Sequence, residues 1–317
     1  MNRRLEVIAA GRGGWFTRPD ALAAGYSDSQ VRQRVQSGQW IRMSFNSYVD
    51  PRGWPADEPL WERAIRLHRL RVRMARERLG AVVVSHQSAA LLHGLPVWGT
   101  DLAAAHFTRL GAGQSRSGRQ IRVHRGALAA DEIVELNGLQ VTACERAVVE
   151  TACTTSYEVG VVLADGAWRL GLSARDRLAA VVRRHRHWHG LPAARAAVEF
   201  ADGRSESVGE SRLRVLMANH GLPAPELQVE IRDEAGRFIG RVDFLLVGTL
   251  VVEFDGAVKY GDTADAVLAE KRREDRLRER GYGVIRINWA DLGRPHETAA
   301  RLWRAVSMYA VGTGDRQ

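Results

Sequence analysis

The sequence predicts a protein of the α+β or α/β class, built in three parts. The first observation is that residues 1–55 carry three short helical patterns followed by two short strand patterns. The second is that residues 241–289 carry two Val- and Leu-rich runs, separated by Gly248, then a charged helical pattern and a last strand. The third is the length of 317 residues, which suggests two or three domains.

The composition indicates a globular protein of the cytoplasm. Hydrophobic residues make up 45% and charged residues 26% of the chain. No run reaches the roughly 18 apolar residues of a membrane span, so we expect no membrane partner. The N-terminus begins like a signal peptide, but its short apolar run is broken by Glu6 and Arg12. The two cysteines, Cys144 and Cys153, are interpreted as small buried residues in a reducing compartment.

The charge favours a polyanionic partner. The net charge is +9 and the isoelectric point is about 10.3, which suits nucleic acid above all other common partners. An arginine-rich proteome without a specific partner would give the same numbers, so charge alone does not decide the function.

In residues 1–55, called the head below, capping residues and helix-breaking residues predict where each helix begins and ends. Thr17 is placed to cap a helix that Gly25 terminates, and Ser27 or Asp28 to cap the next one. The expected helices and strands are residues 3–10, 17–24, 30–36, 38–43 and 46–49.

This order of helices followed by a strand pair is typical of a winged helix-turn-helix, whose third helix enters the major groove of DNA. Its polar and basic side chains are of the kinds that contact base edges and phosphates. The predicted DNA-binding residues are Ser29, Gln30, Arg32, Gln33, Arg34 and, in the strand pair, Arg42. A winged helix used only for protein contacts is the alternative.

Residues 14–22 (GWFTRPDAL), 38–42 (GQWIR) and 48–49 carry a family resemblance. This stretch resembles the N-terminal domain of AbiEi-type antitoxins of type IV toxin–antitoxin systems, which repress their own operon by binding DNA. The resemblance implies DNA and a cognate toxin as partners. Residues 138–146 and 164–168 resemble the second part of such antitoxins.

The middle region, residues 56–200, mixes helices and strands without a catalytic constellation. The arginine-rich helix at 60–79 is interpreted as a solvated face in preference to a phosphate-binding one, and residues 110–119 as a flexible basic loop. His185, His187 and His189 would not share a face of a helix, so they are interpreted as basic surface and not as a metal site. The other expected elements are residues 82–84, 85–92, 103–108, 120–123, 139–142, 144–153 and 156–168.

Three carboxylates mark the predicted C-terminal sheet, residues 201–317. Asp243 is expected to open one strand of a hairpin, and Glu253 and Asp255 to close the other. Residues two apart in a strand share a face, and the hairpin brings Asp243 near them. Converging carboxylates repel one another unless a cation lies between them, and oxygen ligands suit a hard divalent ion that can activate water.

This order of motifs, over residues 205–292, resembles the PD-(D/E)xK nuclease superfamily and, within it, Vsr-like proteins. The resemblance implies that Asp243 and Glu253 hold Mg²⁺ or Mn²⁺ directly, with Asp255 or Glu210 adding a ligand or orienting water. Lys259 would stabilise the transition-state charge. The usual acid-x-Lys motif is altered here, because Asp255 occupies the place of the lysine. For Glu210, stabilisation of a helix N-terminus is the alternative role.

The lysine usage bears on this altered motif. Of 46 basic residues, Lys259 and Lys271 are the two lysines, and both lie in the motif region. An ammonium is a compact point charge and a guanidinium is a planar fork, so a scissile phosphate is a reason to keep a lysine.

Two functions therefore compete. The favoured one is a DNA-binding protein, organised as 1–55, 56–200 and 201–317, whose last domain is a metal-dependent DNA endonuclease. The alternative is a type IV antitoxin-like transcriptional repressor whose nuclease-fold domain is catalytically inactive.

Overall fold

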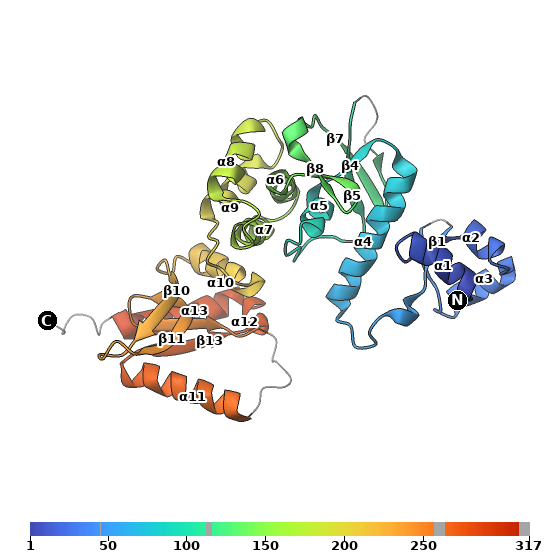
Figure 1. The fold of residues 1–317 in the computed structure, drawn as a ribbon. Helices are drawn as coiled ribbons and strands as arrows, with labels where there is room; N and C mark the ends of the chain where they lie inside the picture. The colour runs from blue at the N-terminus through green and yellow to red at the C-terminus, as the bar shows by residue number, and fades with distance from the viewer. Residues whose placement is uncertain (45, 112–115, 257–263, 311–317) are drawn as a thin grey trace. The chain divides into compact units, whose positions relative to one another are not determined.

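The computed structural model describes residues 1–44, 46–111, 116–256 and 264–310 (Figure 1). These residues form a mixed α/β structure with helices and three β-sheets. The chain divides into two compact units, Met1–Thr151 and Ala152–Gln317. None of the described helices combines the length and the apolar character that a membrane span requires.

The first unit begins with three helices and a strand pair close to the predicted positions, together with a short strand, Phe16–Thr17, that was not predicted. They are α1 (Arg3–Gly11), β1 (Phe16–Thr17), α2 (Arg18–Ala23), α3 (Asp28–Gln36), β2 (Ile41–Ser44) and β3 (Ser47–Val49). Thr17 and Ser27 are the N-caps of α2 and α3, and each is part of a reciprocal capping box. The three strands form an antiparallel sheet in the order β1-β3-β2.

An aromatic core holds these elements together. Phe16 packs edge-on against Trp40 with ring centroids 4.7 Å apart, and it stacks on Tyr48 at 5.9 Å. Leu5 of α1 and Val31 of α3 are buried against the same cluster. Helix α3 buries this one side, and its opposite side, which includes Arg32 and Gln33, is exposed.

The rest of the first unit contains a six-stranded sheet, in the strand order β6-β7-β5-β4-β9-β8, and its helices. Its elements are η1 (Pro51–Gly53), α4 (Leu60–Leu79), β4 (Val82–Val84), α5 (His86–Leu92), β5 (Ala105–Arg109), β6 (Arg116–Ser117), β7 (Ile121–Arg125), η2 (Ala130–Glu132), β8 (Ile133–Leu136) and β9 (Leu139–Thr142).

Two strands of this sheet differ from the prediction. The expected basic loop at 110–119 contains β6, which pairs with β7, while residues 112–115 lie outside the described residues. Strand β9 lies where it was predicted, but β8 was missed, and with it the hairpin that the two strands form. Its turn is Asn137-Gly138 with φ of 51° and 76°, the left-handed pair that a two-residue hairpin needs.

Helices α6 (Cys144–Thr154), α7 (Tyr157–Arg169), α8 (Arg175–Arg184) and α9 (Leu191–Phe200) follow. The prediction that His185, His187 and His189 lie on a helix is wrong, because this segment is a turn between α8 and α9. His185 stacks on Trp188 with ring centroids 4.0 Å apart, and Gly190 then takes a left-handed φ of 79° at the start of α9. The segment accordingly forms no metal-ligand cluster among the described residues.

The second unit ends in a four-stranded sheet of order β10-β11-β12-β13. Strands β10 to β12 are antiparallel, and β13 runs parallel to β12 after a crossover through α11. The elements are α10 (Val208–Asn219), β10 (Glu226–Arg232), β11 (Phe238–Leu246), β12 (Leu250–Phe254), α11 (Ala264–Glu279), β13 (Gly283–Ile287), α12 (Trp289–Leu292) and α13 (Pro295–Ala310).

Helices cover both faces of this sheet (Figure 1). On one face, Phe244 and Val252 pack against Leu213 of α10 and Leu302 of α13. On the other face, Val251 and its neighbours pack against Leu277 of α11. A buried pair anchors α10 to α7, since Arg214 donates to Asp165 at 2.8 Å.

Candidate functional site

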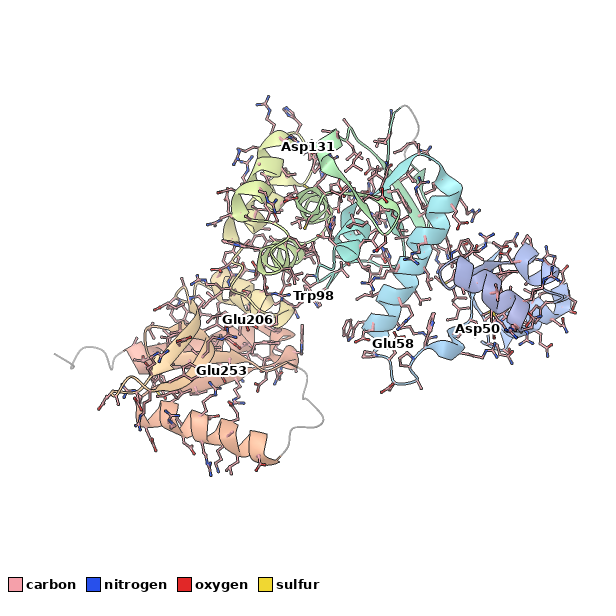
Figure 2. All side chains as sticks on the ribbon, viewed as in Figure 1. Asp50, Glu58, Trp98, Asp131, Glu206 and Glu253 are labelled. Atoms are coloured by element: carbon pink, nitrogen blue, oxygen red, sulfur yellow. The ribbon has the colours of Figure 1, made fainter. Side chains whose placement is uncertain are left out.

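The predicted acids lie on α10 and on two adjacent strands of the C-terminal sheet. Glu210 is in the first turn of α10, and Asp243 is in the interior of β11, not at its start, because β11 begins at Phe238 where it pairs with β10. Glu253 is near the end of β12, on the sheet of the second unit, as Figure 2 shows. Asp255 is the first residue beyond it.

Strand register sets these residues in a row. Phe244 pairs with Val252, so the next residues along, Asp243 and Glu253, lie opposite each other. Glu253 in turn pairs with Arg286 of β13. The hairpin therefore brings Asp243 and Glu253 to adjacent strands, as the sequence predicts.

Gln228 of β10 links the first two acids. Its Nε2 donates to Oε2 of Glu210 at 3.0 Å, and it also hydrogen-bonds the Asp243 carboxylate. Gln228 has a left-handed φ of 55°, while the pairing of β10 with β11 keeps its register on either side, from Leu227 with Phe244 to Val229 with Val242. Asp243 also accepts the backbone N–H of Phe254 at 2.8 Å. Burial raises the pKa of Glu210 and of Asp243, so their ionised forms are costly in this place.

The close approach of α10 depends on a glycine. A Cβ atom at Gly209 would lie 1.9 Å from the ring of Phe254. Only a residue without a side chain lets the helix pass over this ring, so Gly209 determines how near Glu210 comes to the end of β12.

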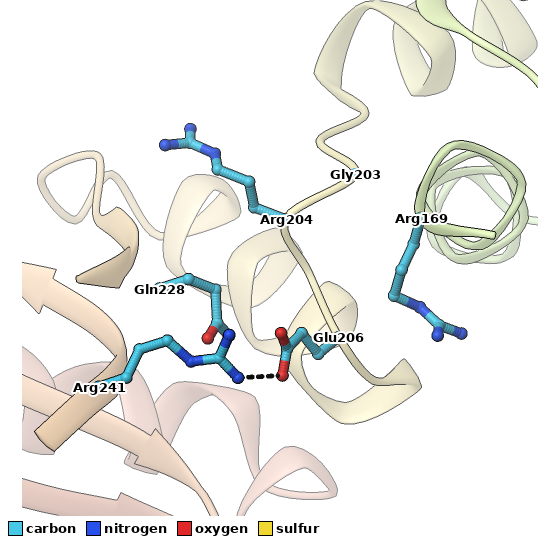
Figure 3. A pocket seen from close by; sticks show the side chains of 6 residues that line it. All are labelled: Arg169, Gly203, Arg204, Glu206, Gln228 and Arg241. Atoms are coloured by element: carbon cyan, nitrogen blue, oxygen red, sulfur yellow. Dashed lines mark hydrogen bonds and ion pairs between the residues drawn. The ribbon is translucent and has the colours of Figure 1, made fainter. Parts of the chain in front are cut away.

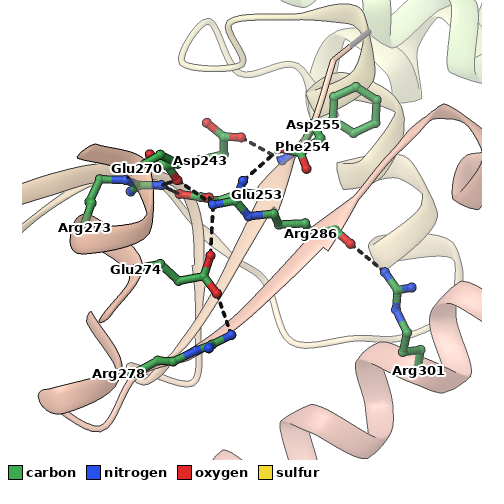
Figure 4. Close-up of polar contacts among 10 residues, drawn as sticks. All are labelled: Asp243, Glu253, Phe254, Asp255, Glu270, Arg273, Glu274, Arg278, Arg286 and Arg301. Atoms are coloured by element: carbon green, nitrogen blue, oxygen red, sulfur yellow. Dashed lines mark hydrogen bonds and ion pairs between the residues drawn. The ribbon is translucent and has the colours of Figure 1, made fainter. Parts of the chain in front are cut away.

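Glu253 is held by arginines from two other elements (Figure 4). Arg273 of α11 donates to its Oε1 at 2.6 Å, and a guanidinium nitrogen of Arg286 lies 3.9 Å from its Oε2. Burial raises the pKa of Glu253, although both arginines oppose that shift. The two arginines are joined by Glu270, which accepts from Arg273 at 2.7 Å and from Arg286 at 2.5 Å.

Asp255 lies on the same side as Glu253 but is exposed. Its Oδ1 is 3.7 Å from a guanidinium nitrogen of Arg286, which therefore contacts both acids. The two-residue spacing places Glu253 and Asp255 on one face, as predicted. Lys259, the predicted positive group, lies outside the described residues.

Glu210, Asp243, Glu253 and Asp255 each offer carboxylate oxygens, which are the ligands that a hard cation prefers. Within the described ranges, Glu210, Asp243, Glu253 and Asp255 do not form a group of three whose ligand oxygens lie within 4.8 Å of one another. Arginine side chains balance the charge of Glu253 in this arrangement. A bound cation there would have to compete with Arg273.

A pocket of about 440 Å³ opens beside Gln228 (Figure 3). Arg241 pairs with Glu206 at 2.8 Å, and Arg204 pairs with Asp202 at 2.7 Å. Basic side chains dominate the lining, which suits a phosphate or another anion. The lining residues are Arg169, Gly203, Arg204, Glu206, Gln228 and Arg241.

In the head, some of the predicted DNA-binding side chains make contacts within α3 and with its neighbouring rings. Gln30 accepts the backbone N–H of Ser27 in the capping box, and the Ser29 hydroxyl bonds that of Ser27. Arg34 packs over the rings of Tyr26 and Trp40, with its guanidinium carbon 5.1 and 5.4 Å from their centroids.

The other predicted DNA-binding residues face solvent. Arg32 and Gln33 are exposed on α3, and Arg42 is exposed on β2. The exposed side of α3 and the adjoining strand thus present two arginines and a glutamine.

Sequence reasoning did not assign a role to Arg273, Arg286 or Gln228. Two signals in the sequence could have indicated these roles. Glu270 and Arg273 are three residues apart on one helix, a spacing that allows an ion pair, and Arg286 lies in the strand that pairs with the strand of Glu253. It also missed a cluster of His86, His106 and His124 in the first unit, whose members are far apart in sequence.

Comparison with known proteins gives three findings. Residues 3–44 match the family described as "Transcriptional regulator, AbiEi antitoxin", which supports a DNA-binding regulator. The crystal structure of the RV2827C protein from Mycobacterium tuberculosis is similar, with a TM-score of 0.39 and 16% identity over 62% of this chain and 75% of that one. Two curated proteins of M. tuberculosis, the uncharacterised proteins MT2308 and Rv2248, are each 31% identical over 277 residues, 87% of this chain and 95% of theirs. The chain therefore belongs to the same protein family as MT2308 and Rv2248.

Proposed function

We propose that the protein is a DNA-binding transcriptional regulator of the AbiEi antitoxin type. The observation that carries this proposal is the match of residues 3–44 to that regulator family, which spans α1 to β2. In this proposal α3 enters the major groove, where Arg32 and Gln33 contact base edges. Arg42 of β2 contacts a phosphate. The head is thus a winged helix-turn-helix used for DNA.

Binding can be measured by fluorescence anisotropy on a duplex from upstream of the protein's own coding sequence, beside a scrambled duplex. Arg32→Ala should weaken binding to the upstream duplex by about 1–3 kcal/mol, because a base contact is lost. Arg42→Ala should weaken binding to both duplexes and lower the slope of log affinity against log salt concentration by about 1, because a phosphate contact is lost. Gln33→Ala should lower the preference for the upstream duplex without changing the slope. The matched control is Arg4→Ala, since Arg4 is an exposed arginine on α1. Equal losses for Arg4→Ala and Arg32→Ala would contradict this use of α3.

A cognate toxin is the second expected partner. Such systems pair the antitoxin with a neighbouring gene for a nucleotidyltransferase. Co-expression of that neighbour with and without this protein tests the proposal: growth arrest relieved by the protein supports it, and growth arrest that persists contradicts it.

The second candidate function is metal-dependent hydrolysis of DNA by the C-terminal part of the second unit. It is favoured by the row of Asp243 and Glu253 on adjacent strands, with Glu210 joined to Asp243 through Gln228. The order of α10, three antiparallel strands, α11 and a parallel β13 resembles the PD-(D/E)xK arrangement.

In this mechanism Asp243 and Glu253 would hold Mg²⁺ or Mn²⁺, and Glu210 or Asp255 would orient the attacking water. The ion would supply a more acidic water and charge stabilisation. Glu253 must first release Arg273, and the released guanidinium can then bind the phosphate. Lys259 would add positive charge at the phosphorus.

Cleavage of labelled duplex, mismatched and single-stranded DNA with Mg²⁺ or Mn²⁺ tests this candidate. Cutting by the wild type that is lost in Asp243→Ala and kept in Glu230→Ala would support it, because Glu230 is an exposed acid of the same sheet. No cutting by any of the three proteins, with salt-sensitive DNA binding intact, would leave a regulator whose nuclease-like module is inactive.

A further inference from the structure

Three histidines from separate parts of the first unit come together on its sheet. His106 lies in β5 and His124 in β7, and the parallel register pairs His106 with Arg122. His124 follows two residues later, so His106 and His124 share a face. His86 is the first residue of α5, beside the strand β4 that pairs with β5. His86 and His106 are buried, and His124 is half-buried.

The ring nitrogens of these histidines are spaced as ligands of one ion. One nitrogen from each ring lies within 4.8 Å of the other two. Nδ1 of His106 is 3.0 Å from Nε2 of His124, and the rings of His86 and His124 lie 3.8 Å apart between centroids. Neighbouring nitrogens of a tetrahedral zinc site lie about 3.4 Å apart, as zinc–nitrogen bonds of about 2.0–2.1 Å require. The rings of His86 and His124 are stacked with an interplanar angle of 17°, so one of them must rotate out of this stacking before both lone pairs point at one ion.

Neighbouring side chains determine which nitrogen each buried ring presents. Nε2 of Gln87 is 2.9 Å from Nε2 of His106 and 3.3 Å from the carbonyl oxygen of Asp101. For Nδ1 of His106 to bind an ion, the ring proton must lie on Nε2, because a neutral imidazole has one donor and one acceptor nitrogen. The amide oxygen of Gln87, which is buried without a hydrogen-bond partner among the described residues, accepts that proton once the amide is turned over, and Nδ1 then faces Nε2 of His124. Nδ1 of His86 lies 2.9 Å from the Ser85 hydroxyl, which leaves Nε2 of His86 as the ligand.

The Ser85 hydroxyl is the hydrogen-bond partner of Nδ1 of His86, and the carboxylate of Glu150 positions His86 through its backbone. Oε2 of Glu150 lies 3.7 Å from Nδ1 of His86 and accepts the backbone N–H of His86 at 3.2 Å. Arg146 fixes Glu150 by donating to its Oε1 at 2.7 Å. His86 has a left-handed φ of 54°, a conformation that a residue with a side chain keeps only where its surroundings hold it.

We propose that His86, His106 and His124 bind one divalent transition-metal ion, with Zn²⁺ as the best match, and that Glu150 is a positioning residue for His86. Imidazole nitrogens suit zinc and its neighbours in the first transition row. Three protein ligands leave a fourth position for water or an anion. The site joins α5, β5 and β7, and it goes beyond the proposed DNA-binding function.

The protonation state of the rings agrees with this site. Burial lowers the pKa of His106 to about 3 and also lowers the pKa of His86 and His124. Neutral rings have the lone pair that a metal ligand needs.

The test is a titration of the chelator-treated full-length protein with Co²⁺, followed by its ligand-field absorption, and then competition with Zn²⁺. We expect about one ion per chain for the wild type, with the band lost on adding Zn²⁺. His124→Ala should lower the affinity at least about 10-fold, and Glu150→Gln about 10- to 100-fold. The control is His187→Ala, because His187 is an exposed histidine of the second unit; its affinity should equal that of the wild type.

Two results would overturn the proposal: no ligand-field band for the wild type, or equal Co²⁺ affinity for the wild type and His124→Ala. Circular dichroism checks that each variant is folded. If His124→Ala does not fold, His124→Asn keeps a polar side chain at this half-buried position and gives the same comparison. The titration contains no DNA, so its outcome is independent of the regulator proposal.

Discussion

The two units contain arginine–carboxylate clusters that look alike in composition but differ in burial. In the first unit, Arg146 donates to Glu132 at 2.5 Å and to Glu150 at 2.7 Å, and all three side chains are at most 6% exposed. In the second unit, Arg273 is 20% exposed and Glu270 is 40% exposed.

The difference separates a structural cluster from one that can exchange partners. A fully buried ion pair cannot lose a member without leaving an unpaired charge in a medium of low dielectric. In the partly exposed cluster, water, a phosphate or a cation can replace Arg273 at Glu253. Carboxylates that exchange partners are therefore expected in the second cluster. The first cluster is expected to keep its members in fixed positions, including Glu150 beside His86.

The largest expected effect is the loss of Arg146. Arg146→Ala should lower the free energy of unfolding by about 3–5 kcal/mol, because Glu132 and Glu150 would remain buried without their partner. Urea denaturation measures this change. Arg122→Ala is the control, since Arg122 is exposed in the same sheet and should change stability by less than about 0.5 kcal/mol. Equal effects of the two substitutions would remove the distinction between the clusters.

The second effect, of Arg273→Ala, should be smaller and should depend on pH. We expect a loss of about 1–3 kcal/mol at neutral pH, since Glu253 loses a hydrogen-bonded partner. Burial already raises the pKa of Glu253 above that of the unfolded chain, so stability falls as pH rises through the folded-state pKa. Removing Arg273 raises that pKa further, so the loss should be greater at neutral than at acidic pH.

Urea denaturation at several pH values, with the exposed neighbour Arg272→Ala as control, tests this prediction. A loss from Arg273→Ala that is the same at acidic and neutral pH would contradict the coupling between Arg273 and Glu253.

The smallest effect is a gain in stability. Burial raises the pKa of Asp243 above its value in the unfolded chain. The folded protein is therefore more stable at acidic pH, where Asp243 is protonated, and loses this stability as pH rises through the folded-state pKa. Asp243→Asn should therefore stabilise the protein at neutral pH by about 0.5–1 kcal/mol. Thermal unfolding measures this gain.

Asp233→Asn is the matched comparison and should act in the opposite direction. Backbone hydrogen bonds in its turn lower the pKa of Asp233, so its ionised form is favoured by folding. Destabilisation by Asp243→Asn at neutral pH would mean that this carboxylate is structural.

Local signals predicted most of the elements. Capping residues such as Thr17 and Ser27 and the terminating glycines determined helix ends, and these act within a few residues of the chain. The β8–β9 hairpin was missed although its Asn137-Gly138 turn is a local signal. The segment 185–189 was assigned to a helix, although Gly190, with a left-handed φ of 79°, lies directly after it and was a local signal for a break.

The sites were predictable only where their residues are close in sequence. Asp243 and Glu253 belong to one hairpin, so their meeting follows from the strand pattern. Arg273 reaches Glu253 from a helix, and its role depends on how α11 covers the sheet. His106 and His124 meet through the register of two parallel strands, which sequence spacing does not reveal.

The contact between Gly209 and Phe254 has an evolutionary consequence. Because a Cβ at position 209 would collide with the ring at 254, neither residue can change alone without moving the helix that carries Glu210. Relatives that replace this glycine should carry a smaller side chain at position 254. The two positions should therefore covary across the family, and relatives that break the pairing are expected to have lost the acid at position 210 as well.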